Sequence, residues 1–144
     1  MRINQKIISY ALAVFLVATG IAYVMVAYGE YQDYKELKEI GIKGEAAEKQ
    51  VEMTFFAIAV AMNFGLCAWV LKPGKTNAFP YIAAIVVSIA LIATYVASRT
   101  VGVPIIGVEY YVGRLDIVSK ILQAIVVAIS GFAVYNIIRN QKNI

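Results

Sequence analysis

The sequence of 144 residues is 61% apolar and only 15% charged, with a mean hydropathy of +0.73. A soluble globular domain is nearer half apolar and a quarter charged, so this composition excludes one. The net charge of +4 is spread over the termini and loops, unlike the single basic stripe of a nucleic-acid-binding protein. The sequence has no histidine, so it lacks the commonest transition-metal ligand and the commonest general base.

The apolar residues fall in four uncharged runs of about 18 to 23 residues, at positions 7–29, 53–71, 76–98 and 121–138. An α-helix needs about 20 residues to cross a hydrocarbon core of ~30 Å. We therefore predict an all-α integral membrane protein in which residues 1–144 form a single four-helix bundle. The predicted spans are about 7–28, 51–71, 78–97 and 115–138.

The first span follows a short basic lead that contains Arg2 and Lys6. Its uncharged run is longer than the ~7 to 15 apolar residues of a secretory signal, so we expect a retained anchor. The interfacial part of this span is predicted from aromatic residues, since amphipathic rings settle at the membrane–water boundary. These residues are Tyr23, Tyr28, Tyr31 and Tyr34.

The segment between the first two spans is the one strongly polar part of the chain, and it is rich in helix formers. Its charges recur at helical i,i+3 and i,i+4 spacings, with Gly41 and Gly44 on either side of a predicted turn. We expect the two spans to continue beyond the bilayer as an antiparallel helical hairpin that turns at Gly41–Gly44.

The connection between the second and third spans is a short basic turn at residues 72–75, which predicts that these two spans are neighbours. The termini and this turn carry bases and no acids. Although the bases on the two sides are nearly equal in number, those of the termini and the turn crowd short segments at the helix ends. We therefore expect both termini in the cytoplasm.

The connection between the last two spans concentrates charge in an apolar segment that cannot be helical throughout, because Gly102, Pro104, Gly107 and Gly113 interrupt it. Its charged residues are Arg99, Glu109, Arg114, Asp116 and Lys120. Arg99 is positioned to reach Glu109 or Asp116, and Lys120 lies one helical turn beyond Asp116. These residues predict either a polar pocket or docking surface near the membrane face, or a structural cluster of ion pairs that holds span 3 to span 4.

Few polar groups lie within the spans. Asn63 is a candidate intramembrane contact, which we expect to hydrogen-bond to a neighbouring helix, and Gln123 and Asn136 are treated alike. Glu52 and Lys120 stand at span edges, where long side chains can reach the interface. Without histidine or a second cysteine, Met25, Met53 and Met62 do not predict a copper site.

Small residues recur at four-residue spacing in three of the spans, which permits close packing within the bundle or against another subunit. They are Ala57, Ala61 and Gly65; Ala90, Thr94 and Ser98; and Ala124 and Ala128. The spacing itself does not distinguish internal packing from an intersubunit contact.

The run S-R-T-V-G-V-P at residues 98–104, followed by G-R-L-D-I-V-S-K at residues 113–120, resembles a pattern of small four-span membrane proteins of archaea and actinobacteria. The resemblance covers about a sixth of the chain closely. The richness in Ile, Lys, Asn and Tyr is similar to that of ammonia-oxidising archaea, whose copper membrane monooxygenase has small helical accessory subunits. The resemblance implies such a subunit, which without histidine would not itself hold the copper.

We therefore expect a non-catalytic accessory subunit of a larger membrane complex, with membrane lipids and other integral subunits as partners and no nucleic acid. The alternative is a small oligomeric transporter or channel component, with Arg99, Glu109 and Asp116 at its mouth and Asn63 in its path. No phosphate-binding loop, nucleophile–base set or metal-ligand spacing occurs in the sequence, so we expect neither an enzyme nor a cofactor.

Overall fold

The structure is a computed structural model that describes residues 4–73, 77–102, 107–108 and 113–143. The described residues form four helices, α1 (Gln5–Glu39), α2 (Lys43–Leu71), α3 (Phe79–Thr100) and α4 (Arg114–Lys142). All four are long and apolar enough to cross a membrane. The chain is therefore an all-α, multi-pass membrane protein, and the predicted fold class is confirmed.

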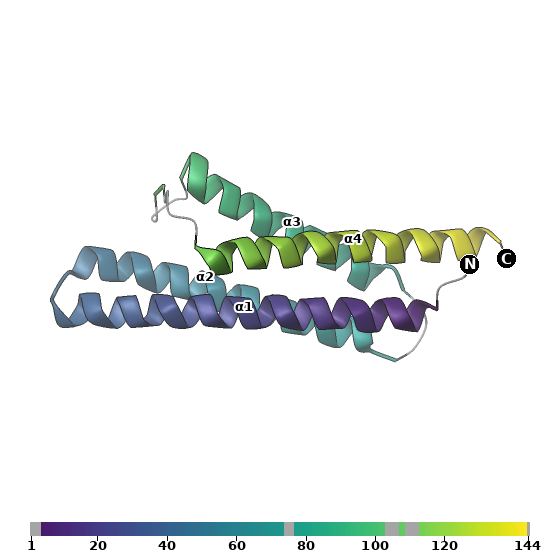
Figure 1. The fold of residues 1–144 in the computed structure, drawn as a ribbon, viewed down its shortest axis with the longest axis horizontal. Helices are drawn as coiled ribbons and strands as arrows, with labels where there is room; N and C mark the ends of the chain where they lie inside the picture. The colour runs from purple at the N-terminus through teal and green to yellow at the C-terminus, as the bar shows by residue number, and fades with distance from the viewer. Residues whose placement is uncertain (1–3, 74–76, 103–106, 109–112, 144) are drawn as a thin grey trace.

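The helices follow one another around the bundle, so each contacts its neighbours in sequence and α4 returns to α1 (Figure 1). The pair α1–α2 has the most extensive contact and the pair α2–α3 the least. Spans 2 and 3 are thus neighbours, as the short turn predicted, but they pack together only weakly. The first and last helices bring the two ends of the chain to the same end of the bundle, where Asn136 Nδ2 donates to Gln5 Oε1 at 3.0 Å.

The half of the bundle nearest the termini has a closely packed apolar core. Five of its side chains have no exposed surface, or almost none: Leu12, Leu16, Ala84, Val126 and Ala133. These residues come from α1, α3 and α4, and Leu66 of α2 packs with them. Large and small side chains interdigitate here, as in other protein interiors, so this layer separates the polar end of the bundle from the termini.

The α1–α2 hairpin extends past the ends of α3 and α4 (Figure 1). Its turn is a glycine C-cap in which Gly41 has a positive φ of 83°. The Gly41 amide donates to the Lys38 carbonyl at 3.2 Å, and the Ile42 amide donates to the Leu37 carbonyl at 3.0 Å. This pair of bonds satisfies carbonyls that the helix end leaves open. The predicted hairpin is confirmed, although the turn is shorter than predicted, because α2 begins at Lys43 and contains Gly44.

Most of the small residues at four-residue spacing point out of the bundle. The exposed ones are Ala57, Ala61 and Gly65 of α2, Ala90 of α3, and Ala124 and Ala128 of α4. Only Thr94 and Ser98 are partly buried. The internal packing of the bundle therefore uses other residues, and these faces are open to lipid or to another chain.

The apolar layer yields a prediction. Leu16→Ala should lower the free energy of unfolding toward the lower end of the range of about 2–5 kcal/mol for buried Leu→Ala changes. The lower end is expected because a leucine side chain that leaves the core when the helices separate enters lipid or detergent rather than water. Its burial therefore contributes less free energy than it would in a soluble protein. The measurement is unfolding of the purified protein in detergent, with Val14→Ala, on the exposed side of the same helix, as the matched control. Equal losses in the two variants would contradict the assignment of this core.

Candidate functional site

A cavity of about 510 Å³ lies between the four helices at the end of the bundle opposite the termini. Seven of its lining residues are charged: Glu30, Asp33, Lys49, Glu52, Arg99, Asp116 and Lys120. Aromatic and aliphatic side chains complete the wall, among them Tyr23, Phe56, Leu91 and Tyr95. The space exists because α2 and α3 have little contact and so do not close the bundle here.

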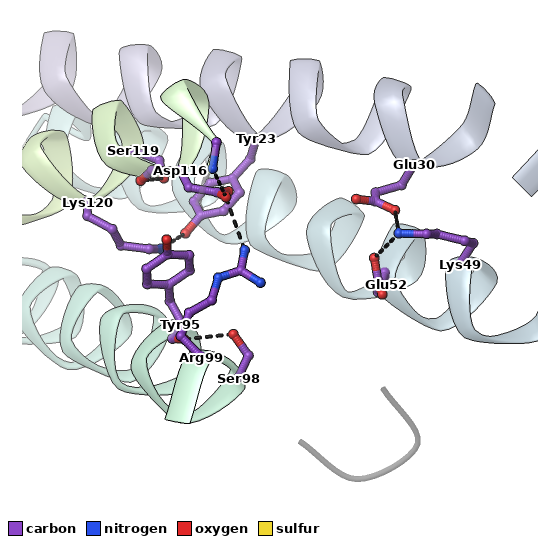
Figure 2. A network of polar contacts seen from close by, with 11 residues as sticks. Tyr23, Glu30, Lys49, Glu52, Tyr95, Ser98, Arg99, Asp116, Ser119 and Lys120 are labelled. Atoms are coloured by element: carbon purple, nitrogen blue, oxygen red, sulfur yellow. Dashed lines mark hydrogen bonds and ion pairs between the residues drawn. The ribbon is translucent and has the colours of Figure 1, made fainter. Parts of the chain in front are cut away.

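Arg99 of α3 and Asp116 of α4 form one of the two alternative ion pairs that the sequence predicted, with Arg99 Nη2 at 3.1 Å from Asp116 Oδ2 (Figure 2). The same carboxylate oxygen accepts the Gly113 amide at 3.1 Å, which satisfies a donor at the start of α4 where the helix dipole favours negative charge. The Arg99 guanidinium also lies over the Tyr95 ring, 4.8 Å from its centroid. The pair therefore joins α3 to α4 and forms part of the cavity wall.

Tyr23 of α1 is hydrogen-bonded to α4, the helix that also carries Asp116. Its hydroxyl accepts hydrogen bonds from Lys120 Nζ at 2.8 Å and from Gln123 Nε2 at 2.6 Å, and Lys120 also donates to Gln123 Oε1 at 3.0 Å. Only 2% of Tyr23 is exposed, and Gln123 is fully buried. The ammonium group of Lys120 further faces the rings of Tyr23 and Tyr95, with 5.3 and 5.0 Å to their centroids.

These contacts correct two predictions. Tyr23 is not an interfacial ring facing lipid but a buried hydrogen-bond acceptor, while Tyr28 and Tyr31 are exposed. Lys120 neither extends along the surface toward the interface nor forms the i,i+4 ion pair with Asp116, because its ammonium group turns inward to Tyr23 and Gln123.

A second charged group lines the cavity from the α1–α2 hairpin. Lys49 Nζ lies 2.8 Å from Glu30 Oε2 and 3.1 Å from Glu52 Oε2 (Figure 2). Glu52 is 6% exposed, so the prediction that it extends to the interface is wrong; the neighbouring ammonium group holds it inside. Lys49 lies outside the span at 51–71. Burial lowers its pKa, but the hydrogen bonds and charges of Glu30 and Glu52 raise that pKa more, and the net shift is upward.

The remaining predicted residues lie apart from these clusters. Arg114 is exposed and does not line the cavity, and Glu109 lies outside the described residues. Asn63 is buried at 2% exposure, but its Nδ2 donates at 2.8 Å to the Ala59 carbonyl of its own helix. The prediction that it bonds to a neighbouring helix is therefore wrong.

The hairpin cluster was missed, although the sequence contains a signal for it. In a hairpin that turns at Gly41, residues at equal distances before and after position 41 lie side by side. Glu30 and Glu52 are such a pair. Lys49 then lies one turn from Glu52 at i,i+3. The predicted contacts of Gln123 and Asn136 with a neighbouring helix are confirmed, since their side-chain amides donate to Tyr23 and Gln5 of α1.

Charged groups of both signs, aromatic rings and an apolar wall in one cavity are the features of a binding site. In the described part of the chain, no group of three or more His, Cys, Asp or Glu side chains is placed to hold a metal ion. Compared with protein-family models, with curated proteins and with solved structures, the chain gave no match.

The Arg99–Asp116 pair yields a second prediction. Arg99→Ala should lower the free energy of unfolding by about 1–3 kcal/mol, because it leaves a mostly buried carboxylate without its ion-pair partner. Lys72→Ala removes an exposed charge and should change it by less than about 0.5 kcal/mol. The measurement is thermal or chemical unfolding in detergent. Equal stability of the two variants would contradict a structural role for the pair.

Tyr23 yields a third prediction. Tyr23→Phe keeps the ring but removes the acceptor of two hydrogen bonds, and it should cost about 1–3 kcal/mol of unfolding free energy. Tyr28→Phe removes an exposed hydroxyl from the same helix and serves as the control, with an expected change within about 0.5 kcal/mol. A Tyr23→Phe variant as stable as the control would show that the network contributes little to the bundle.

Proposed function

We propose that the chain is a non-catalytic accessory subunit of a larger membrane protein complex and that its α1–α2 hairpin docks on a partner. The observation that carries this proposal is the apolar tip of the hairpin. Ile40 and Ile42 are 69% and 42% exposed, although they lie at the turn of the charged hairpin, between Glu39 and Lys43, and outside the apolar spans. Residues 30–39 extend α1 by about 15 Å past its uncharged run, so the tip stands clear of the bilayer.

The outward-facing small residues on α2 and α4 support the same proposal. Faces built from Ala and Gly let another transmembrane helix approach closely, and the bundle itself does not use them. A subunit of this kind would contact its partner within the membrane through these faces and outside it through the hairpin.

The loop before α4 resembles that of small four-span proteins of archaea and actinobacteria, and the richness in Ile, Lys, Asn and Tyr is similar to that of ammonia-oxidising archaea. Together they make the copper-dependent ammonia monooxygenase of archaea the candidate complex. In that setting the chain lies in the cell membrane with other integral subunits as partners. With both termini in the cytoplasm, as the basic residues of the termini and the 72–75 turn favour, the hairpin tip and the cavity face the opposite side of the membrane.

The alternative, a small oligomeric transporter or channel component, draws support from the cavity but less from the rest of the bundle. On the side of the cavity nearest the termini, the space between the helices is filled by Leu12, Leu16 and Val126, which are almost completely buried. This packing argues against an open channel through a single copy, although the side chains of Thr19, Ser88 and Ser130 are buried as well. A flux assay in proteoliposomes would favour this alternative if flux depended on Arg99.

A fourth prediction tests the proposal. The double change Ile40→Asp and Ile42→Asp should reduce recovery of the chain with its complex by roughly tenfold or more, since two apolar side chains contribute a few kcal/mol when buried at an interface. The measurement is native electrophoresis of mildly solubilised membranes of the source organism, followed by mass spectrometry of the band.

The matched control is the double change Glu39→Gln and Lys43→Gln, which alters exposed polar residues of the same turn. Migration of the unaltered chain alone, or of the Ile40 and Ile42 variant with the intact complex, would contradict the proposed docking.

A further inference from the structure

The cavity has two walls of opposite charge. The wall formed by α1 and α2 has three carboxylates and one ammonium group, from Glu30, Asp33, Glu52 and Lys49. The wall formed by α3 and α4 has two cations and one carboxylate, from Arg99, Lys120 and Asp116. Both groups line the same cavity. Figure 2 shows Glu30, Lys49 and Glu52 on one side and Arg99, Asp116 and Lys120 on the other. A ligand with separated positive and negative charges matches this arrangement better than a ligand of one sign.

The positive wall contains a cation whose hydrogen-bond partners are neutral. Lys120 donates to Tyr23 and Gln123, and the nearest carboxylate on its own helix, Asp116, is bound by Arg99. The ring of Tyr95, which also lines the cavity, lies 5.0 Å from this ammonium group. An ammonium group with three N–H donors, two of them bonded to neutral acceptors, is suited to a phosphate or carboxylate oxygen.

The depth of the cavity indicates what kind of molecule carries those charges. Its deeper wall is apolar and includes Val26, Phe56 and Leu91, whereas Asp33 and Lys49 lie beyond the uncharged runs of α1 and α2. The cavity therefore spans the boundary between hydrocarbon and water, the level at which lipid headgroups lie. Its volume of about 510 Å³ suits a headgroup with the first part of its chains.

We propose that this cavity binds a membrane lipid with a zwitterionic head that combines a phosphate and an ammonium group. The phosphate lies at Lys120, the ammonium group lies among the carboxylates of the hairpin, and the chains leave between α2 and α3, where helix contact is least. Basic pockets between helices bind phosphate headgroups in other membrane proteins. The second, acidic wall adds selectivity for the ammonium group. This assignment does not depend on which complex the chain belongs to.

The test is native mass spectrometry of the purified full chain in mild detergent, titrated with three lipids of equal chain length. Phosphatidylethanolamine has both charges, phosphatidylglycerol has only the phosphate, and diacylglycerol has neither. We expect phosphatidylethanolamine to bind roughly tenfold more tightly than either of the others, the size expected for one charge-assisted hydrogen bond. Equal binding of phosphatidylethanolamine and phosphatidylglycerol would overturn the role of the acidic wall.

Two variants locate the site. Lys120→Met, at the phosphate end, and Asp33→Asn, at the ammonium end, should each weaken phosphatidylethanolamine binding several-fold. Asp33 is exposed, so its variant stays informative if Lys120→Met does not fold. The matched controls are Arg114→Gln and Glu36→Gln, exposed residues of the same end that do not line the cavity. Unchanged binding in Asp33→Asn would overturn the proposal.

A further arm distinguishes the lipid from a soluble zwitterion. Free phosphoethanolamine at millimolar concentration should leave the lipid-bound fraction unchanged, because the apolar wall holds the chains. Full displacement by phosphoethanolamine would overturn the lipid assignment and identify a site for a water-soluble zwitterion.

Discussion

The inward-facing ammonium group of Lys120 is the constraint around which the polar half of this bundle is built. A charge at this depth is costly unless strong hydrogen-bond acceptors surround it. The hydroxyl of Tyr23 and the amide oxygen of Gln123 serve this purpose, and together they tie α4 to α1. Asp116, one turn earlier on α4, ties the same helix to α3 through Arg99.

These contacts hold two helix pairs together while leaving a space between them. The hairpin of α1 and α2 has its own charged cluster, in which Lys49 joins Glu30 and Glu52. Since α2 and α3 have little direct contact, the space opens between these two helices, while Tyr23 keeps α1 bonded to α4. The apolar layer around Leu12 and Val126 closes the terminal half.

The arrangement separates two tasks along the bundle axis. Close packing in the terminal half maintains the fold, and the open half presents charges, rings and an apolar wall at the membrane boundary. Beyond the cavity, the hairpin carries the exposed tip formed by Ile40 and Ile42. Binding within the cavity and docking of the tip would therefore occur on the same side of the membrane.

The sequence by itself determined the number of helices, their approximate ends and the hairpin, and it limited the predicted partners of Arg99 to Glu109 and Asp116. Each of these depends on local properties: the length of an uncharged run, the backbone freedom of glycine, or the distance between charges at neighbouring helix ends. Only the tertiary structure decided which way Tyr23, Glu52, Asn63 and Lys120 face. Hydropathy places a residue along a span, but the rotation of each helix about its axis is set by packing against the others. The orientations of the helices also place most of the small residues on the outer face of the bundle. They bring the two charged clusters, one from the hairpin and one from α3 and α4, to the same cavity.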